Sequence, residues 1–320
     1  MKALVQTELT GPQALEVREV PPPKTGDDLL IEVAAAGVGF PDVLMSKGMY
    51  QDRLDPPFVP GYEIAGTVVD AGAAARSRVG SRVLAFPGSG GHAQLAVASP
   101  AMTLDLPDDL DFVDAIRLGS NYQTALLALL RGDAKAGERA LVFGAGGGLG
   151  NALVDAASAM GLEVVAVAGS ESKLELARAA GATHLIPLGD DVVEKVRQIF
   201  PEGVDLVLDP VGGKCLEDGV RLLAVRARLM ILGFASGEIG SIAPNRLLIR
   251  DADARGVVWG ASAKRDPTLP GEIWRELLSL REGGNLNPAG GPTYALDQGA
   301  RALADIEGRR VVGKAVLTVD

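Results

Sequence analysis

A glycine-rich segment that directly follows a short apolar run is the part of the sequence best suited to bind a ligand. Residues 141–143 are Leu-Val-Phe, residues 144–150 are Gly-Ala-Gly-Gly-Gly-Leu-Gly, and apolar side chains at helical spacing come next. Glycines let the backbone turn sharply and approach a pyrophosphate, and the unpaired N–H groups at a helix start attract the anion. We expect a strand, a phosphate-binding loop and a helix, with ligand contacts at Gly147, Gly148, Leu149 and Gly150.

The loop departs from the strict dinucleotide-binding pattern, because Ala145 takes the position of the first glycine before Gly147 and Gly150. A merely flexible loop is the alternative interpretation. Further apolar strand cores alternate with helical segments after the loop, at residues 164–168, 185–186, 204–208, 229–232 and 257–259. Repeated strand–helix units predict a doubly wound parallel sheet, and in that context the loop is typical of a nucleotide site.

The end of the predicted strand at residues 164–168 bears on the choice of nicotinamide cofactor. NAD-binding proteins place an acidic residue there on the ribose 2′-hydroxyl, whereas an NADP site has cations and small residues. Here the strand runs into Gly169 and Ser170, and Glu171 is expected to face solvent. Ser170 can donate to a 2′-phosphate and Lys173 can supply charge, so NADPH is expected. An ordinary surface lysine is the alternative for Lys173.

The first 120 residues have a different texture, with short strands interrupted by proline and glycine. Strands are expected at residues 29–33, 64–69, 79–86 and 93–97. This pattern predicts an irregular, mostly β module.

The end of the chain has a helix at residues 273–281, a second helix at 298–307 and a final strand at 313–319. We expect this tail to rejoin the N-terminal module. The predicted domains are therefore residues 1–120 with 264–320 and, between them, residues 121–263.

Composition argues against several classes of function. The 320 residues carry a formal net charge of −10, and no block of Lys and Arg offsets it, so nucleic acid is not an expected partner. No apolar stretch approaches the roughly 20 residues of a membrane helix. One cysteine, Cys215, and two histidines are a poor inventory for a zinc site. Met1 leads into a strand without a signal-peptide pattern, so a cytoplasmic location is expected.

Motifs spread over the whole chain carry a resemblance to a known family. They lie at residues 37–45 (Gly-Val-Gly-Phe-Pro-Asp-Val-Leu-Met), 48–50, 57–69, 121–125, 209–213, 245–250, 258–260 and 312–314. Taken together, they resemble the zinc-free quinone oxidoreductase branch of the medium-chain dehydrogenase/reductase family. The resemblance implies an α/β protein with a GroES-like, mostly β catalytic domain and a Rossmann-type domain with a doubly wound parallel sheet.

Two positions of the resemblance bear on metal binding. Zinc-dependent relatives ligate their catalytic metal with a cysteine where this chain has Gly39 and with a histidine where it has Tyr62. The resemblance therefore implies that no metal is bound. The chain also departs from the quinone reductases, which usually carry an asparagine at the position of Gly39 and a tyrosine near the position of Leu188.

The resemblance implies catalytic roles for three residues of the N-terminal module. Tyr50 is expected to face the substrate and donate to one of its oxygens. Tyr62 is expected to line the substrate site beside the nicotinamide, as a wall or as a hydrogen-bond donor. Gly39 stands where the relatives orient the substrate. Simple packing is the alternative role for both tyrosines.

The resemblance also adds cofactor contacts to those of the glycine-rich loop. Thr124 is expected at the nicotinamide end, and backbone groups after the last two strands are expected along the ring and its carboxamide. Core filling is the alternative role for Trp259. The added residues are Thr124, Gly169, Val211, Gly233, Phe234, Val258, Trp259 and Gly260.

Other chemically capable side chains are expected to be structural. Asp42 could be mistaken for an acid catalyst, but an Asp at such a position commonly ties its segment through backbone hydrogen bonds. His92 and His184 have no carboxylate or cysteine at motif spacing. Cys215 lies on a predicted helix with no nearby base, which favours a buried, inert thiol.

The expected chemistry is reduction. Without a Lewis acid an alkoxide is poorly stabilised, whereas a conjugated carbonyl places the developing charge on an enolate or hydroquinone oxygen. We therefore expect hydride transfer from NADPH to a quinone or related conjugated carbonyl. The alternatives are reduction of a 2-enal, enone or enoyl thioester, and a catalytically idle NADPH-binding sensor or structural protein. A homodimer is expected, because relatives pair at the sheet edge that corresponds to residues 257–259.

Overall fold

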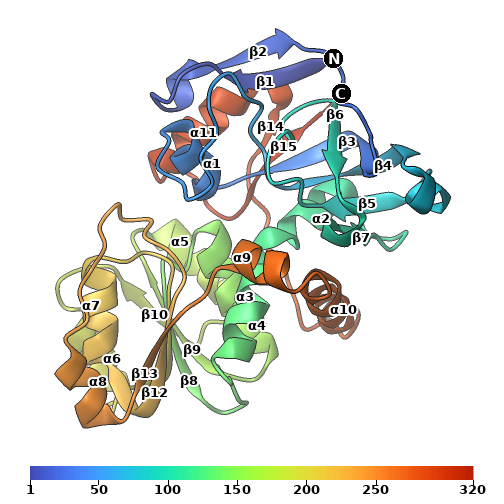
Figure 1. The fold of residues 1–320 in the computed structure, drawn as a ribbon. Helices are drawn as coiled ribbons and strands as arrows, with labels where there is room; N and C mark the ends of the chain where they lie inside the picture. Colours follow the sequence, from blue (N-terminus) through green and yellow to red (C-terminus); the bar gives the residue numbers. More distant parts are fainter. Residues whose placement is uncertain (320) are drawn as a thin grey trace. The chain divides into compact units, whose positions relative to one another are not determined.

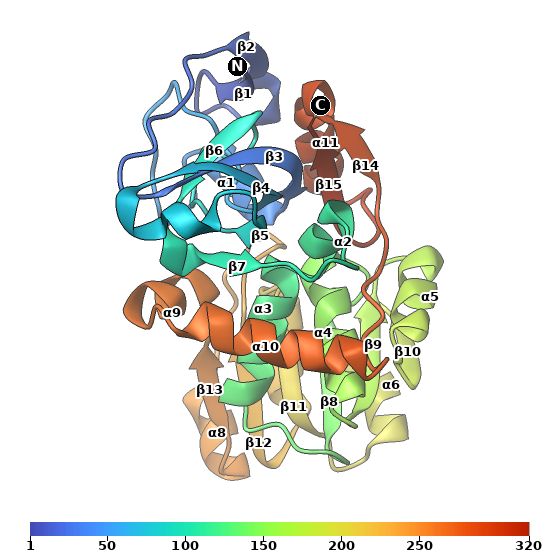
Figure 2. The ribbon, with the colours of Figure 1, turned by 90° about the vertical axis from the view of Figure 1, so that its right-hand side faces the viewer.

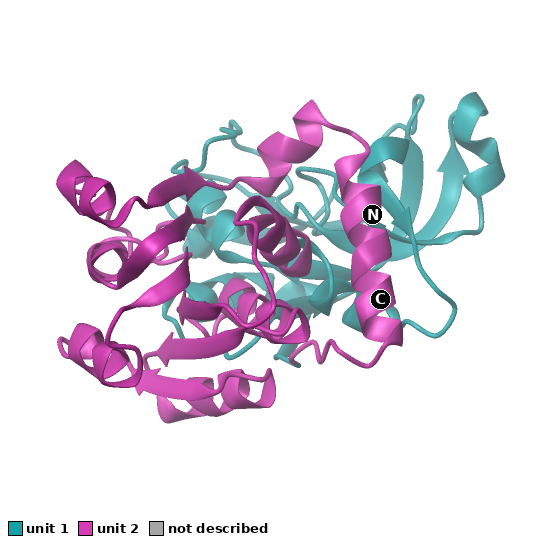
Figure 3. Cartoon of the chain, turned by 90° about the horizontal axis from the view of Figure 1, so that it is seen from below, with its two compact units in different colours: residues 1–120, 290–320 teal, residues 121–289 magenta. Residues whose placement is uncertain are grey.

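The chain passes twice between two compact units, after Ser120 and after Ala289. The computed structural model describes residues 1–319. Unit 1 comprises Met1–Ser120 with Gly290–Asp320, and unit 2 comprises Asn121–Ala289 (Figure 3). Residues 264–289, which the sequence pattern assigns to the N-terminal module, thus group with unit 2.

Unit 1 is built on an antiparallel sheet with a parallel edge pair. Its strands run in the order β14-β15-β3-β4-β5-β7, and β6 also pairs with β3. Only β14 and β15 pair in parallel among these described strands. The strands are β3 (Leu29–Val38), β4 (Ile64–Ala71), β5 (Arg82–Ala85), β6 (Leu95–Ala98), β7 (Thr103–Asp105), β14 (Thr293–Ala295) and β15 (Ala315–Thr318).

Alternate side chains of β3 point into the hydrophobic core of unit 1. Leu29, Ile31 and Val33 are buried, and the residues between them are more exposed, as a strand with one face on a core requires. A hairpin of β1 (Lys2–Gln6) and β2 (Leu15–Glu19) and short helices complete the unit (Figure 1). The helices are η1 (Pro12–Ala14), α1 (Phe40–Ser46), η2 (Ala73–Arg78), η3 (Pro100–Met102), α2 (Phe112–Arg117), η4 (Leu296–Gln298) and α11 (Gly299–Glu307).

Unit 2 contains an all-parallel sheet in the order β10-β9-β8-β11-β12-β13. In chain order this is 3-2-1-4-5-6, the arrangement of a doubly wound dinucleotide fold. The inner strands β8, β9 and β11 are almost entirely buried, as strands covered by helices on both faces must be. The strands are β8 (Arg139–Phe143), β9 (Glu163–Ala168), β10 (His184–Pro187), β11 (Val204–Asp209), β12 (Leu223–Ile231) and β13 (Asp253–Gly256).

Helices cover both faces of this sheet. Figure 1 shows α6, α7 and α8 on one face and α3 and α4 on the other. Buried Val192 and Val196 of α6 and Leu216 and Val220 of α7 belong to the same apolar cluster as the strands. The helices are α3 (Ser120–Arg131), α4 (Gly148–Ala159), α5 (Glu171–Ala179), α6 (Val192–Ile199), α7 (Lys214–Arg221), α8 (Pro244–Arg250), α9 (Trp259–Arg265) and α10 (Leu269–Glu282).

The helix α10 explains why residues 264–289 group with unit 2. Its apolar side is buried, at Ile273, Trp274 and Leu277. The Gln123 side chain of α3 donates to the carbonyl of Pro270 at 3.1 Å, which fixes the start of α10 on α3 (Figure 2).

The sixth strand of unit 2 is not where the sequence pattern puts it. Residues 257–259 are predicted as a strand, but β13 ends at Gly256 and Trp259 begins α9. The apolar residues 257–259 misled the prediction, because all four residues of the actual strand β13 are exposed and no buried face marks it in the sequence.

No helix within residues 1–319 combines the length and the apolar character that crossing a bilayer requires.

Candidate functional site

The glycine-rich loop joins β8 to α4 through a turn that only glycine adopts readily. Gly144 has φ 63°, and the N–H of Gly147 donates back to its carbonyl at 3.0 Å. A Cβ on Gly150 would overlap that same carbonyl, so α4 can start this close to the loop only with glycine there. The predicted strand, loop and helix are present in this order.

The departure at Ala145 has a structural reason. The sharp turn is made one residue earlier, at Gly144, so the next position does not need a glycine. The N–H of Ala145 donates to the carbonyl of Val167 at 3.0 Å, and its side chain is fully buried. A small apolar residue therefore serves at this position.

Helix α4 presents its start to the carboxyl edge of the sheet. Gly147 is its N-cap residue and has no side chain to satisfy the first N–H groups of Gly148, Leu149 and Gly150. Such a terminus carries a partial positive charge and suits an anion. The order of the strands also reverses between β8 and β11, and ligands of doubly wound sheets bind at this reversal.

Neighbouring loops meet at the same edge. A Cβ on Gly146 would overlap the Lys173 side chain at the start of α5, so the lysine stem lies across the phosphate loop. A Cβ on Gly144 would lie 2.9 Å from Cγ2 of Val211, in the loop after β11. The structure thus brings the predicted loop, Lys173 and Val211 together.

The chain of contacts continues toward β12. A Cβ on Gly212 would lie 2.6 Å from the ring of Phe234, and one on Gly233 would lie 3.2 Å from the carbonyl of Pro210. Asp209 holds this loop, because its Oδ1 accepts from the N–H groups of Val211 at 2.8 Å and of Gly212 at 3.0 Å. Asp209 belongs to the motif 209–213 that carries the family resemblance, but the sequence alone assigns it no role.

The residues proposed to recognise a 2′-phosphate follow β9. Gly169 has open space where a side chain would be. Ser170 is the N-cap residue of α5, but its hydroxyl does not cap the helix and instead lies 3.2 Å from that of Ser172. Leu188, near whose position quinone reductases usually carry a tyrosine, donates its N–H to the carbonyl of Ala168 at 2.9 Å and is half exposed. It therefore lies beside the strand end that precedes Ser170.

Two residues predicted near the nicotinamide end, Thr124 and Trp259, belong to helices α3 and α9. Thr124 lies on α3, next to Gln123, whose side-chain oxygen accepts from the indole N–H of Trp259 at 3.1 Å. The Trp259 side chain is buried, so a ligand contact at Trp259 would involve its backbone. Val258 is the N-cap residue of α9, and a Cβ on Gly260 would have no other heavy atom within 4 Å.

In unit 1, strand register brings Gly39 and Tyr62 together. Strands β3 and β4 are antiparallel, with Ala36 opposite Ile64, so the residue after β3 and the residues before β4 lie at one end of the sheet. A Cβ on Gly39 would lie 2.5 Å from the Tyr62 hydroxyl oxygen. The phenol therefore occupies the space that a side chain at position 39 would need.

Two tyrosines of this unit, Tyr50 and Tyr62, are held as neutral phenols. Burial, together with the carboxylates of Glu63 and Asp42, raises the pKa of Tyr62 well above its usual value. Partial burial and then the carboxylates of Asp52 and Asp42 raise the pKa of Tyr50. Tyr50 also acts electrostatically on Tyr62. The three predicted catalytic residues thus share one region of unit 1, and the phenols can donate hydrogen bonds.

Sequence reasoning missed a buried ion pair beside Tyr62. Lys314 Nζ donates to Glu63 Oε2 at 2.6 Å, and both side chains are almost completely buried. The N–H of Ser120 donates to the other carboxylate oxygen of Glu63. Both residues lie in motifs that carry the family resemblance, which was the available signal, but 251 positions separate them.

Comparison with known proteins decides the family. The chain matches the family models Alcohol dehydrogenase GroES-like domain over residues 25–108 and Zinc-binding dehydrogenase over residues 148–282. It is 31% identical to Quinone oxidoreductase-like protein 2 of Rattus norvegicus over 326 residues, which cover 99% of this chain and 92% of that protein. The chain belongs to the medium-chain dehydrogenase/reductase family. Within it, the chain falls in the quinone oxidoreductase-like branch and is an oxidoreductase.

Solved structures of this family agree in fold. Mycobacterial Rv1454c complexed with NADPH aligns with a TM-score of 0.93 and 29% identity, over 99% of each chain. The quinone oxidoreductase from Thermus thermophilus, also described in complex with NADPH, aligns with a TM-score of 0.85 and 35% identity, over 99% of this chain and 100% of that chain. The expected GroES-like and Rossmann-type fold is confirmed.

One of the matching family models is named for zinc, yet by the family resemblance Gly39 and Tyr62 stand where zinc-dependent relatives have a cysteine and a histidine ligand. Within residues 1–319 no three side chains of His, Cys, Asp or Glu are grouped so that they could hold a metal. That the chain works without zinc stays a prediction, based on the chemistry of these two residues.

The side chains expected to be structural have well-defined partners, with one correction. Asp42 accepts from the N–H of Gly39 at 2.9 Å, which confirms its predicted backbone tie at the start of α1. His92 is buried, with Nε2 3.0 Å from the carbonyl of Gly37. His184 does have a carboxylate partner, since its Nε2 lies 2.9 Å from Glu163 Oε1 on the neighbouring strand. Parallel strand pairing, invisible in the sequence spacing, makes that pair.

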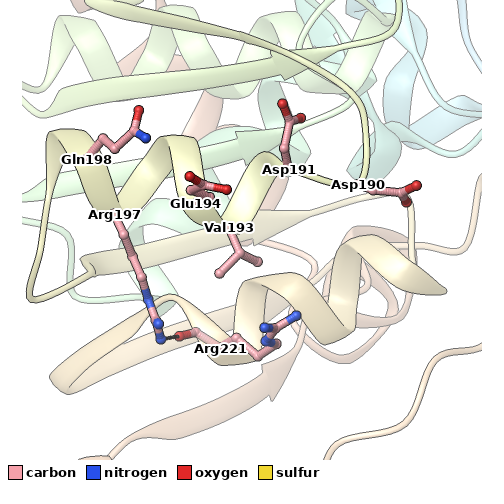
Figure 4. A pocket seen from close by; sticks show the side chains of 7 residues that line it. All are labelled: Asp190, Asp191, Val193, Glu194, Arg197, Gln198 and Arg221. Carbon is pink, nitrogen blue, oxygen red and sulfur yellow. Dashed lines mark hydrogen bonds between the residues drawn. The ribbon is translucent and has the colours of Figure 1, made fainter.

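A surface hollow on unit 2 is not part of the candidate site. It has a volume of about 530 Å³ and is lined by Asp190, Asp191, Val193, Glu194, Arg197, Gln198 and Arg221. Figure 4 shows Arg197 turned to the carbonyl of Arg221, which accepts from it at 3.1 Å. The hollow mixes carboxylates with guanidinium groups along α6 and α7, and contains none of the predicted site residues.

Proposed function

We propose that this protein reduces quinones or related conjugated carbonyl compounds with NADPH and without zinc. The observation that carries the proposal is the contact between Gly39 and Tyr62. Where zinc-dependent relatives place two metal ligands, this chain has Gly39, which has no side chain, and Tyr62, whose neutral phenol occupies the space beside Gly39. A phenol can donate to an oxygen on which charge develops, and a conjugated carbonyl provides such an oxygen.

The residues of unit 2 fit NADPH. Gly147, Gly148, Leu149 and Gly150 would hold the pyrophosphate, and Gly169, Ser170 and Lys173 the 2′-phosphate. The structures of relatives that are described in complex with NADPH support this choice of cofactor. When bound, NADPH would supply the hydride, and water would supply the proton that completes the reduction. Val211, Gly233, Phe234, Thr124, Val258, Trp259 and Gly260 would orient the nicotinamide end.

Tyr62 and Tyr50 would stabilise the product oxygen. Their pKa values are raised, so both phenols stay protonated at neutral pH and can donate without first gaining a proton. Neither acts as a base in this scheme. Positioning and hydrogen bonding, rather than proton abstraction by a side chain, would supply most of the rate.

The acceptor decides between the proposed reaction and its alternatives. Oxidation of NADPH would be followed with a naphthoquinone, a 2-alkenal and crotonyl thioester, and with NADH in place of NADPH. Turnover fastest with the quinone is the expected result. Turnover only with the alkenal or thioester would replace the quinone by an activated double bond. Tight NADPH binding without turnover of any acceptor would leave a cofactor-binding sensor.

We further propose a homodimer formed through the edge strand β13. All four residues of β13 are exposed, and an unpaired edge strand is a template for pairing with another strand. Leu248 and Ile249 on the adjoining α8 are 82% and 74% exposed, which is unusual for large apolar side chains. Asp253 and Arg255 would face each other across a two-fold axis at Ala254. A cytoplasmic location stays a prediction.

A further inference from the structure

The Glu63 carboxylate sits in a space that two glycines leave open. A Cβ on Gly37 would overlap Oε2 of Glu63, and one on Gly119 would overlap Oε1. The carboxylate is fully buried and accepts from the ammonium of Lys314 at 2.6 Å and from the N–H of Ser120. A buried charge of this kind is retained only with such partners, so the ammonium of Lys314 is fixed in place.

The strand register explains why this ion pair lies beside the catalytic phenol. Lys314 precedes β15, whose Ala315 is opposite Val38 at the end of β3. Glu63 precedes β4, on the other side of β3. Lys314, Gly39 and Glu63 are therefore at the same end of three adjacent strands.

The fixed ammonium faces the ring of Tyr62. Lys314 Nζ lies 5.9 Å from the ring centroid, within the range in which a cation is attracted to the face of an aromatic ring. The ion pair thus acts on the ring, and the backbone at Gly39 faces the hydroxyl at the ring's far end. The Ser120 side chain also hydrogen-bonds with Tyr62. These three contacts together orient the phenol.

We propose that Lys314 and Glu63 are positioning residues for the Tyr62 hydroxyl, and that Gly39 is the gap that admits it. The inference rests on the proposed function, in which Tyr62 donates to the acceptor oxygen. If position 39 carried a side chain, the Tyr62 hydroxyl could not stay in the orientation in which it donates to the acceptor. A chain of this branch with a phenol at position 62 therefore needs glycine at position 39, in place of the asparagine of the quinone reductases.

The first test is a double-mutant cycle between the ion pair and the phenol. Glu63→Gln with Lys314→Met removes both charges together, so no unpaired charge is left in the core, and the amide can still accept from Ser120. With a naphthoquinone as acceptor, Tyr62→Phe should lower kcat about 100-fold, as loss of an oxyanion donor does. The paired substitution should lower kcat about tenfold with the KM for NADPH unchanged.

The decisive comparison is the paired substitution in the Tyr62→Phe background. It should then have almost no further effect on kcat, because the hydroxyl that it positions is gone. A purely structural ion pair would lower the melting temperature and would change kcat by the same factor in both backgrounds, which would overturn the proposal. Glu63→Gln alone and Lys314→Met alone each leave one unpaired buried charge, and their melting temperatures show how much that charge destabilises the protein.

The second test examines position 39. Because the displaced atom is the far end of a side chain, Gly39→Ala should turn the phenol away with little loss of stability. It should lower kcat nearly as much as Tyr62→Phe, and the double substitution should be no worse than Tyr62→Phe alone. Additive losses would contradict the conflict between a side chain at position 39 and this orientation of Tyr62.

A readout without cofactor or acceptor separates this inference from the proposed function. Tyrosine ionisation is followed by absorbance, and the Tyr62 contribution is the difference between each protein and its Tyr62→Phe counterpart. In the wild type this phenol should stay protonated beyond the usual range, and in Gly39→Ala it should ionise at lower pH. Unchanged titration would refute the positioning even if the enzyme turns over. Absence of turnover with the expected titration would refute only the proposed function.

Discussion

The phenol of Tyr122 donates a 2.5 Å hydrogen bond to Oδ2 of Asp155, and the pair is buried. The N–H of Asn287 donates to the same oxygen at 2.9 Å. Tyr122 stands at the beginning of unit 2 and Asn287 near its end. The Asp155 carboxylate on α4, the helix that follows the phosphate loop, therefore holds the first and last segments of unit 2 by hydrogen bonds.

Asp155 should make stability depend on pH in a defined direction. Burial raises its pKa above the usual 3.8, although the bonds from Tyr122 and Asn287 oppose the shift. The folded protein then holds this proton more tightly than the unfolded chain does. Below pH 3.8 the carboxyl is protonated in both states, so it does not affect the free energy of unfolding. As the pH rises from 3.8 through the raised pKa, the unfolded chain loses this proton first, and the folded protein becomes less stable.

Asp155→Asn removes this dependence while keeping an acceptor for Tyr122. In urea unfolding from about pH 4 to pH 7, the wild type should lose stability relative to the variant as the pH rises. The exposed Asp108→Asn provides the matched control, for which no such trend is expected. A wild type that gains stability over the variant in this interval would show that the bonds outweigh burial.

Lys173→Ala should discriminate between the two nicotinamide cofactors. The lysine stem lies against Gly146 of the phosphate loop, and the proposed NADPH site has its ammonium contact the 2′-phosphate. Loss of one charge-assisted contact should raise the Kd for NADPH about tenfold or more and leave that for NADH nearly unchanged. Fluorescence titration measures both, with Lys195→Ala on α6 as control. Equal losses for both cofactors would refute the role of Lys173.

Gly150→Ala should disrupt the phosphate loop. The added Cβ would overlap the carbonyl of Gly144, which is backbone and cannot rotate away. NADPH binding should become undetectable, and the melting temperature should fall. Gly271→Ala, in α10 with nothing within 4 Å of the added Cβ, is the control and should be neutral or slightly stabilising. Normal NADPH binding by Gly150→Ala would show that the loop does not hold the pyrophosphate.

Much of the fold can be predicted from local pattern, because buried parallel strands are long apolar runs and the loop at Gly144 needs glycine for its conformation. The edge strand β13 escaped prediction because it is exposed and polar, while the apolar residues beside it begin a helix. The two tyrosines that we propose as catalytic can be found by resemblance. The Glu63–Lys314 pair could not be found by spacing, because strand pairing alone joins residues so distant in sequence.

The metal requirement can be tested directly. With Gly39 and Tyr62 at the ligand positions, purified protein should contain much less than one zinc per chain by elemental analysis. Dialysis against a chelator should leave the rate of NADPH oxidation with a naphthoquinone unchanged, since no Lewis acid takes part in the proposed scheme. Activity that is lost on chelation and restored by zinc would show a metal site that these residues do not predict.

The proposed homodimer depends on the exposed apolar surface next to β13. Leu248→Ser with Ile249→Ser should weaken association, because two copies would no longer bury these side chains against each other. Light scattering after size-exclusion chromatography should give twice the 33.0 kDa chain mass for the wild type and one chain mass for the variant at micromolar concentration. Ile239→Ser, at a side chain 78% exposed in the same unit, is the matched control and should remain dimeric. A monomeric wild type, or a variant with the same mass as the wild type, would place the interface elsewhere.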